Sequence, residues 1–142
     1  MPDIHHNLFI AAPAEKVYDA ITTQEGLSGW WCPGTTAKPE VDSIARFDFQ
    51  SREQQEMKIT ELKPVRLVKW FCLKADEEWI GTTLSFELQP AEKGTRLSFH
   101  QDGWKEYTQM FAVCNYTWAL FMRSLKLLCE TGKGRPSPNQ LQ

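Results

Sequence analysis

The chain has 142 residues, of which 42% are hydrophobic, and this length and composition predict a single domain with a sizeable core. Its formal net charge is -2 and its Lys and Arg residues are scattered, which argues against a nucleic-acid partner. The start of the chain is polar and no apolar run is long enough to span a bilayer, so we expect neither a signal peptide nor a membrane protein.

The four cysteines, Cys32, Cys72, Cys114 and Cys129, form no CxxC pair. Two of them fall on the apolar face of a predicted helix, so we interpret them as buried thiols rather than metal ligands or redox centres. Unpaired core thiols are typical of proteins from a reducing compartment, and we therefore predict a cytoplasmic protein.

The first part of the chain predicts a strand followed by two short helices. Side chains alternate along Ile4–Ile10, as in a half-buried strand. Pro13 suits the first turn of a helix that follows. A second short helix is predicted from Gln24 to about Trp31, and Gly26 and Gly29 are expected to weaken it.

Residues 32–42 predict a loop rich in Pro, Gly and Thr, and the chain after it is typical of a β-sheet. Apolar and polar side chains alternate in five segments separated by short turns, which predicts five strands. These segments are residues 45–49, 57–60, 66–73, 79–88 and 95–100.

Residues 106–130 predict one long helix without an internal Pro or Gly. Apolar side chains recur there at alternating spacings of three and four, which places them on one face. At 1.5 Å per residue the helix would be roughly 37 Å long, enough to cross a small domain. Gly132 follows as a stop signal. The predicted face carries Tyr107, Phe111, Cys114, Trp118, Phe121, Leu125 and Leu128.

These elements predict an α+β fold in a single domain spanning residues 1–142. Short turns join antiparallel neighbours, and alternating strands need only one covered face. We therefore expect a curved antiparallel sheet of about six strands, wrapped around the long C-terminal helix, with two short helices after strand 1. The polar tail from about residue 134 is expected to be loose.

The order of these elements resembles the helix-grip fold of the START and Bet v superfamily, also called SRPBCC. Within it, the chain is similar to the branch of the Aha-type activators of the heat-shock chaperone ATPase, and more specifically to their C-terminal domain. The resemblance extends over nearly the whole chain. The segments that carry it are Ala12–Thr22, Glu25–Trp31, Trp79–Thr82, Gly94–His100 and Leu125–Pro136.

The resemblance implies an apolar cavity between the sheet and the long helix, in which family members hold lipids, sterols, polyketides or aromatic metabolites. The expected function is thus binding of a small hydrophobic or aromatic molecule. One alternative is an enzyme of the cyclase or dehydratase kind that acts on such a ligand. Another is a protein-interaction module associated with a chaperone, but 142 residues leave no room for the second domain that usually binds it.

Aromatic side chains are the candidate lining of this cavity, since the chain has six Trp and eight Phe residues. They either line a cavity or simply fill the core. Trp30 and Trp31 would sit at its mouth, on a short helix with a Pro/Gly loop behind it. The candidate cavity residues are Trp30, Trp31, Trp70, Trp79, Phe86, Phe99, Phe111, Asn115, Trp118 and Met122.

Asn115 is the polar member of this set. It shares a helix face with Phe111, Trp118 and Met122, so we predict that its amide projects among apolar neighbours. The alternatives to a ligand-orienting role are a bond to a neighbouring strand or to water, or a place at the edge of the apolar stripe.

The sequence contains no recognisable catalytic set. GxSxG, HExxH and Gly-rich phosphate loops are absent, so we expect binding rather than catalysis. His5 and His6 are adjacent on a strand and point to opposite faces, so we expect no metal site and no cofactor. An exposed edge strand or a surplus Trp would favour a homodimer, and the sequence leaves that alternative open.

Overall fold

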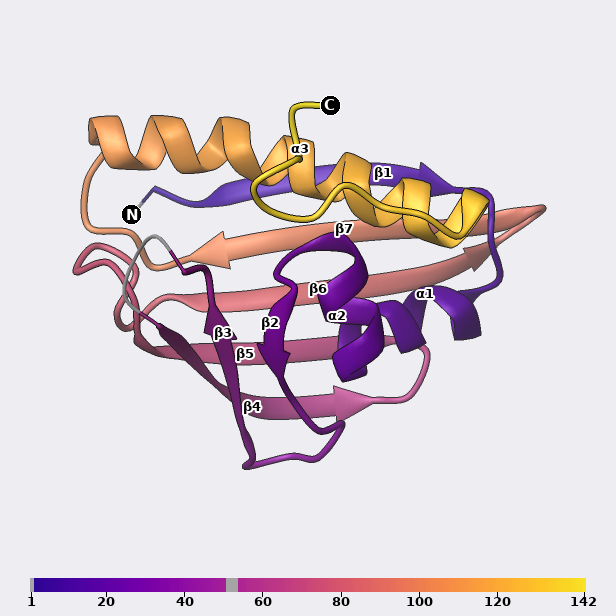
Figure 1. Ribbon diagram of the computed structural model, residues 1–142, viewed down its shortest axis with the longest axis horizontal. Coiled ribbons are helices and arrows are strands. Elements are labelled where there is room, and N and C mark those ends of the chain that lie inside the picture. The colour runs from indigo at the N-terminus through magenta and orange to yellow at the C-terminus, as the bar shows by residue number, and fades with distance from the viewer. Residues whose placement is uncertain (1, 51–53) are drawn as a thin grey trace.

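The computed structural model describes residues 2–50 and 54–142. Its strands form an antiparallel sheet. Its strands are β1 (Ile4–Ile10), β2 (Gly34–Thr36), β3 (Ile44–Asp48), β4 (Gln55–Lys63), β5 (Leu67–Lys74), β6 (Thr83–Ala91) and β7 (Gly94–Asp102). They pair in the order β1-β7-β6-β5-β4-β3-β2, so the first strand closes against the last (Figure 1).

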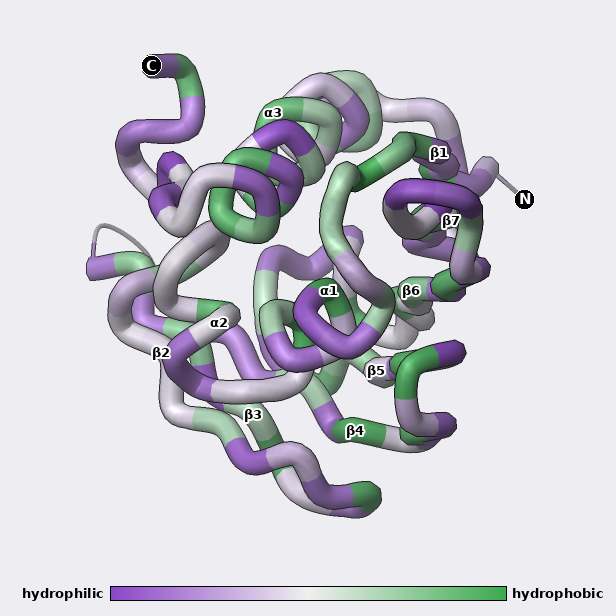
Figure 2. Tube along the Cα trace, turned by 90° about the vertical axis from the view of Figure 1, so that its right-hand side faces the viewer, coloured by the Kyte–Doolittle hydropathy of each residue, from purple (hydrophilic) through white to green (hydrophobic). Residues whose placement is uncertain are grey.

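Three helices complete the described fold: α1 (Ala14–Thr22), α2 (Gln24–Trp30) and α3 (Gln109–Thr131). Viewed end on, the strands follow a curved arc in the order β1, β7, β6, β5, β4 and β3 (Figure 2). Helices α1 and α2 lie inside this arc, and α3 lies across its opening. The prediction of an α+β fold with a curved antiparallel sheet, two short helices after the first strand and a long C-terminal helix is therefore confirmed.

The sheet contains one strand more than the sequence predicts in the described part of the chain. The short strand β2 lies within residues 32–42, which were expected to form a loop, and pairs Thr35 with Phe47 of β3. β6 begins at Thr83 rather than at residue 79, because Gly81 has a φ of +88° and Thr82 N–H donates to the Trp79 carbonyl in a turn.

The long helix starts later than its apolar pattern indicates. Thr108 caps it by accepting a hydrogen bond from the Phe111 N–H at 3.0 Å, so Tyr107 lies before the helix and is exposed. The predicted stop is confirmed, since Gly132 caps the other end with a φ of +88°. No helix in the described ranges is long and apolar enough to cross a membrane.

The inward-facing side chains of the strands form one apolar core beneath α3. As the alternation predicts, Trp70 and Cys72 of β5 are buried while Phe71 between them is exposed. The equivalent positions Phe86 of β6 and Phe99 of β7 are also fully buried and lie opposite each other in the register.

The segment after α3 is held in place, so the expectation of a loose tail is wrong. It turns back along α3 (Figure 1). Arg135 N–H donates to the Ser124 hydroxyl at 2.7 Å, and Ser137 N–H donates to the Trp31 carbonyl at 2.8 Å. The tail thus forms a wall beside α2 and α3.

Candidate functional site

Trp31 lies at the centre of an aromatic cluster inside the arc of the sheet. It follows α2 as its C-cap residue and is almost completely buried. Its ring centroid is 4.5 Å from that of Phe47, 5.2 Å from that of Trp118 and 5.9 Å from that of Trp70. Tilted and offset rings of this kind pack favourably but leave gaps where their edges meet.

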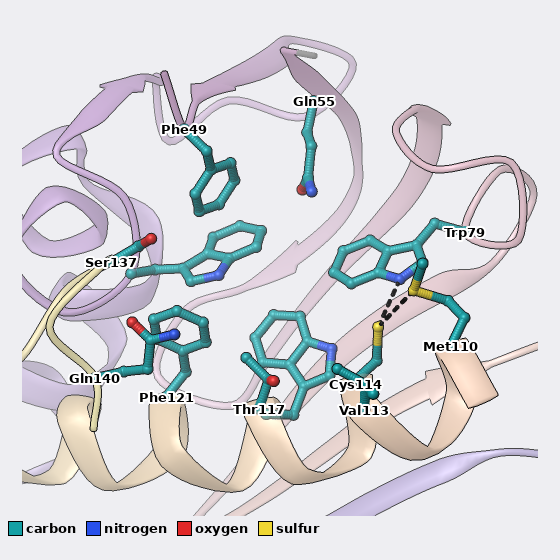
Figure 3. A pocket seen from close by; sticks show the side chains of 12 residues that line it. Phe49, Gln55, Trp79, Met110, Val113, Cys114, Thr117, Phe121, Ser137 and Gln140 are labelled. Carbon is teal, nitrogen blue, oxygen red and sulfur yellow. Dashed lines mark hydrogen bonds between the residues drawn. The ribbon is translucent and has the colours of Figure 1, made fainter. Parts of the chain in front are cut away.

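A pocket of about 340 Å³ opens beside this cluster, between α3, Trp79, the start of β4 and the C-terminal tail (Figure 3). Such a volume lies at the lower end of the range for small-molecule sites. Most of its wall is apolar. Its lining residues are Trp31, Phe49, Gln55, Trp79, Met110, Val113, Cys114, Thr117, Trp118, Phe121, Ser137 and Gln140.

Hydrogen bonds fix the two tryptophans on the α3 side of the pocket. The Trp118 indole N–H donates to Gln101 Oε1 at 2.9 Å, and Gln101 Nε2 donates to the Thr82 hydroxyl at 3.1 Å. The Trp79 indole N–H donates to Cys114 Sγ at 3.2 Å. These bonds satisfy buried polar groups and set the orientation of the rings that face the pocket.

The polar groups that remain in the pocket wall are amides and hydroxyls. Gln55 is 5% exposed, and its Oε1 has no hydrogen-bond partner among the described residues. The Oε1 of Gln140 is likewise buried without a partner in that part of the chain. The lining residues include no Asp, Glu, Lys, Arg or His, so the described wall is uncharged.

The structure brings three of the predicted cavity residues to the pocket: Trp31, Trp79 and Trp118. Six others are buried in the core away from its lining. Trp30, Trp70, Phe86, Phe99 and Met122 are at most 2% exposed, and Phe111 packs edge-on against Trp104 at 5.2 Å.

Asn115 does not line the pocket, so its predicted place in the cavity is wrong, and the alternative of a place at the edge of the apolar stripe holds. Its side chain is exposed, and its backbone carbonyl lies 3.1 Å from His6 Nε2 on β1. The part of α3 that lines the pocket overlaps the predicted apolar face at Cys114, Trp118 and Phe121 and extends to one side of it. The pocket-lining residues of α3 are Met110, Val113, Cys114, Thr117, Trp118 and Phe121.

Sequence reasoning missed most of the polar lining. The predicted apolar face of the helix already contains Cys114 and Phe121, and Thr117 follows the same spacing of three and four, so their participation was detectable. Gln55 looks like an ordinary exposed residue at a strand end, and Ser137 and Gln140 belong to a polar tail. These three reach the pocket only through long-range packing.

The histidines lie apart from this pocket. His5 and His100 face each other in the β1–β7 register and stack with ring centroids 4.2 Å apart, beside Asp102. Burial of the Asp102 carboxyl raises its pKa, and the nearby Asp3 adds to the effect. Within the described ranges, no group of three or more His, Cys, Asp or Glu residues is arranged to hold a metal ion.

Buried thiols elsewhere in the core are poor nucleophiles. Burial raises the pKa of Cys72 to about 11 and that of Cys129 to about 11. Because the thiolate is the reactive form, these two side chains are suited to packing rather than to covalent chemistry.

Comparison with known proteins supports this description of the fold. A solution structure of an Aha1 dimer from Colwellia psychrerythraea is 38% identical, covers 94% of this chain and 100% of its own, and superposes with a TM-score of 0.87. CalU16 from Micromonospora echinospora is 19% identical with a TM-score of 0.74, covering 98% of this chain and 79% of its own.

DynU16, described as a protein in the dynemicin biosynthetic locus, is 18% identical with a TM-score of 0.79. The match covers 93% of this chain and 48% of DynU16, so the two share a fold. No curated protein matches this chain. The family described as activator of Hsp90 ATPase homolog 1-like protein matches residues 11–130. This match covers most of the sequence, and the chain therefore belongs to the Aha1-like family of helix-grip proteins.

Proposed function

We propose that the protein binds a small hydrophobic or aromatic molecule in the pocket between α3, Trp79 and the C-terminal tail. The observation that carries this proposal is the pocket itself, which is about 340 Å³ and is lined mostly by aromatic and aliphatic side chains. Burying apolar ligand surface there gains roughly 25 cal/mol per Å². DynU16, a structural relative from a biosynthetic locus, is in keeping with a metabolite as ligand.

The uncharged wall favours binding over a cyclase or dehydratase reaction. Such a reaction needs an acid or base near a ligand carbonyl, with its pKa shifted towards neutrality. The described lining residues include no carboxylate, and Cys114 is the titratable group among them. A chaperone partner is the other alternative, and it rests on the family name alone.

The first prediction tests the pocket by filling it. N-phenyl-1-naphthylamine is an uncharged probe whose fluorescence rises in apolar sites, and we expect it to bind the wild-type protein with one saturable site. Thr117 faces the pocket, whereas Ala119 of the same helix is exposed. Thr117→Trp is expected to weaken binding at least about tenfold, because a new ring occupies the ligand volume.

The matched variant Ala119→Trp adds the same ring outside the pocket and is expected to bind as the wild type does. Circular dichroism should show both variants folded. Absence of saturable binding to the wild-type protein, or equal weakening by both variants, would reject the pocket as the binding site.

We further propose that two copies of this chain form a homodimer, since the Colwellia relative is a dimer. From Gln109 to Met122, α3 carries no charged residue, including on its outer face. Ala112, Tyr116 and Ala119 are exposed on that face, and Tyr116 is 62% exposed. An exposed apolar helix face of this kind is typical of a protein interface.

The cytoplasm is the proposed location. All four cysteines are free and buried, the state expected in a reducing compartment.

A further inference from the structure

Gln55 has an unusual position for a glutamine. It begins β4, where it pairs with Phe47 of β3, and it is 5% exposed. Its side-chain oxygen Oε1 has no partner among the described residues. A buried carbonyl oxygen normally accepts at least one hydrogen bond, and leaving it unpaired is unfavourable.

The Gln55 amide points into the pocket. Figure 3 shows its end directed from the β4 side into the space between Phe49 and Trp79. The orphaned oxygen is therefore located where a bound molecule would contact it. Gln140, from the tail on the opposite side, contributes a second buried oxygen without a partner in the described chain.

Two buried carbonyl oxygens in these walls, Gln55 Oε1 and Gln140 Oε1, lack a hydrogen-bond partner among the described residues. The indole N–H groups of Trp79 and Trp118 already donate to Cys114 and Gln101. The two glutamine oxygens remain available, and both accept hydrogen bonds. A ligand that satisfies them must present an O–H or N–H group.

The rest of the wall restricts the ligand further. Ring faces and edges of Trp31, Trp79 and Trp118 border the space, which favours a flat aromatic body. The lining offers no side chain of opposite charge to an ionised ligand, and burying an unpaired charge is costly.

We propose that the pocket selects an uncharged aromatic molecule bearing a hydroxyl or N–H group, which donates a hydrogen bond to Gln55 Oε1. This inference rests on the proposed function, because it specifies the ligand class of the same pocket. The ligand would also supply the hydrogen bond that the buried Gln55 oxygen lacks among the described residues.

The test compares two probes of nearly equal size, 1-naphthol and 1-methylnaphthalene, which differ in one hydrogen-bond donor. Binding is measured by quenching of tryptophan fluorescence or by calorimetry. For the wild-type protein we expect 1-naphthol to bind about tenfold more tightly, since the site pairs its hydroxyl. In Gln55→Met this preference is expected to disappear, while 1-methylnaphthalene binds at least as well as before.

Two further measurements separate recognition from folding. Gln54 precedes Gln55 and is exposed, so Gln54→Met is the matched control and should keep the wild-type preference. Because Gln55→Met removes an unpaired acceptor, the melting temperature of the empty protein should rise by about 3 °C. A structural role for the Gln55 amide would instead lower it.

The outcomes distinguish this inference from the proposed function. If both probes bind the wild-type protein equally, or if Gln55→Met keeps the preference for 1-naphthol, the role of Gln55 is overturned and the pocket remains a binding site. If neither probe binds, the proposed function fails together with the inference.

Discussion

Gly26 and Gly29 lie in the same short helix, α2, but a methyl group would meet different surroundings at each. A Cβ at Gly26 would lie 2.5 Å from Ala20 Cα and 2.6 Å from its carbonyl oxygen, both backbone atoms of α1. At Gly29 it would lie 3.2 Å from the flexible end of the Leu128 side chain. Gly26 therefore allows two helices to touch, whereas at Gly29 only the end of one side chain would have to shift.

These two glycines give a matched prediction. Gly26→Ala is expected to lower the free energy of unfolding by about 2 kcal/mol or more, because α1 and α2 must separate. Gly29→Ala should lie within about 1 kcal/mol of the wild type, since the higher helix propensity of alanine offsets a small shift of Leu128. Urea denaturation measures both, and an equal loss at the two positions would contradict the packing argument.

At the scale of elements, Glu130 joins the end of α3 to the end of β1. Its Oε2 accepts a hydrogen bond from the Ala11 N–H at 2.7 Å and another from Lys126 Nζ at 2.8 Å. Lys126 Nζ also donates to the Phe9 carbonyl at 2.6 Å. The bond from Ala11, followed by that from Lys126, lowers the pKa of the Glu130 carboxyl.

A lowered pKa in the folded state means that the ionised carboxylate stabilises the fold. This contribution is complete above the pKa of the unfolded chain and disappears as the pH falls through the lower folded value. Glu130→Gln is expected to cost about 1 kcal/mol at pH 7. The gap to the wild type should narrow towards pH 3.

Denaturant unfolding at several pH values measures that gap. Glu92→Gln, at an exposed hairpin turn, is the control and should change stability little at any pH. A gap for Glu130→Gln that stays constant between pH 7 and pH 3 would show that the carboxylate charge plays no part.

At the scale of the whole molecule, the uncharged outer face of α3 predicts the oligomeric state. Light scattering after size exclusion should give twice the chain mass of 16.4 kDa. Ala112→Lys combined with Tyr116→Lys should give the monomer mass, because four buried charges of one sign would oppose pairing of two such faces. Neither residue lines the pocket, so ligand binding is expected to persist.

Val41→Lys places a charge at another exposed apolar residue, 49% exposed, and should leave the dimer intact. A wild-type protein that runs as a monomer at high micromolar concentration would refute the dimer proposal. Dissociation by Val41→Lys alone would move the interface away from α3.

Most of the fold follows from local sequence patterns, which involve residues close to one another along the chain. Alternation identified the long strands and their buried faces, and the spacing of three and four identified the long helix, because both follow from backbone periodicity. Gly132 marked the end of that helix for a local reason, since it adopts a positive φ. β2 has three residues, too few for a period to show, and it forms only because β3 offers a free edge.

The pocket was decided by tertiary structure. The sequence indicated rings that would be buried, of which Trp31, Trp79 and Trp118 lie in the wall of the pocket, but hydrophobicity does not tell a wall from a filled core. Asn115 lies at the edge of the apolar face of α3, with its side chain exposed, and helical spacing alone does not separate that edge from the pocket. In the sequence, Gln55 and Gln140 look like ordinary polar surface residues. Their side-chain oxygens are buried without partners in the described chain only because distant segments fold against one another.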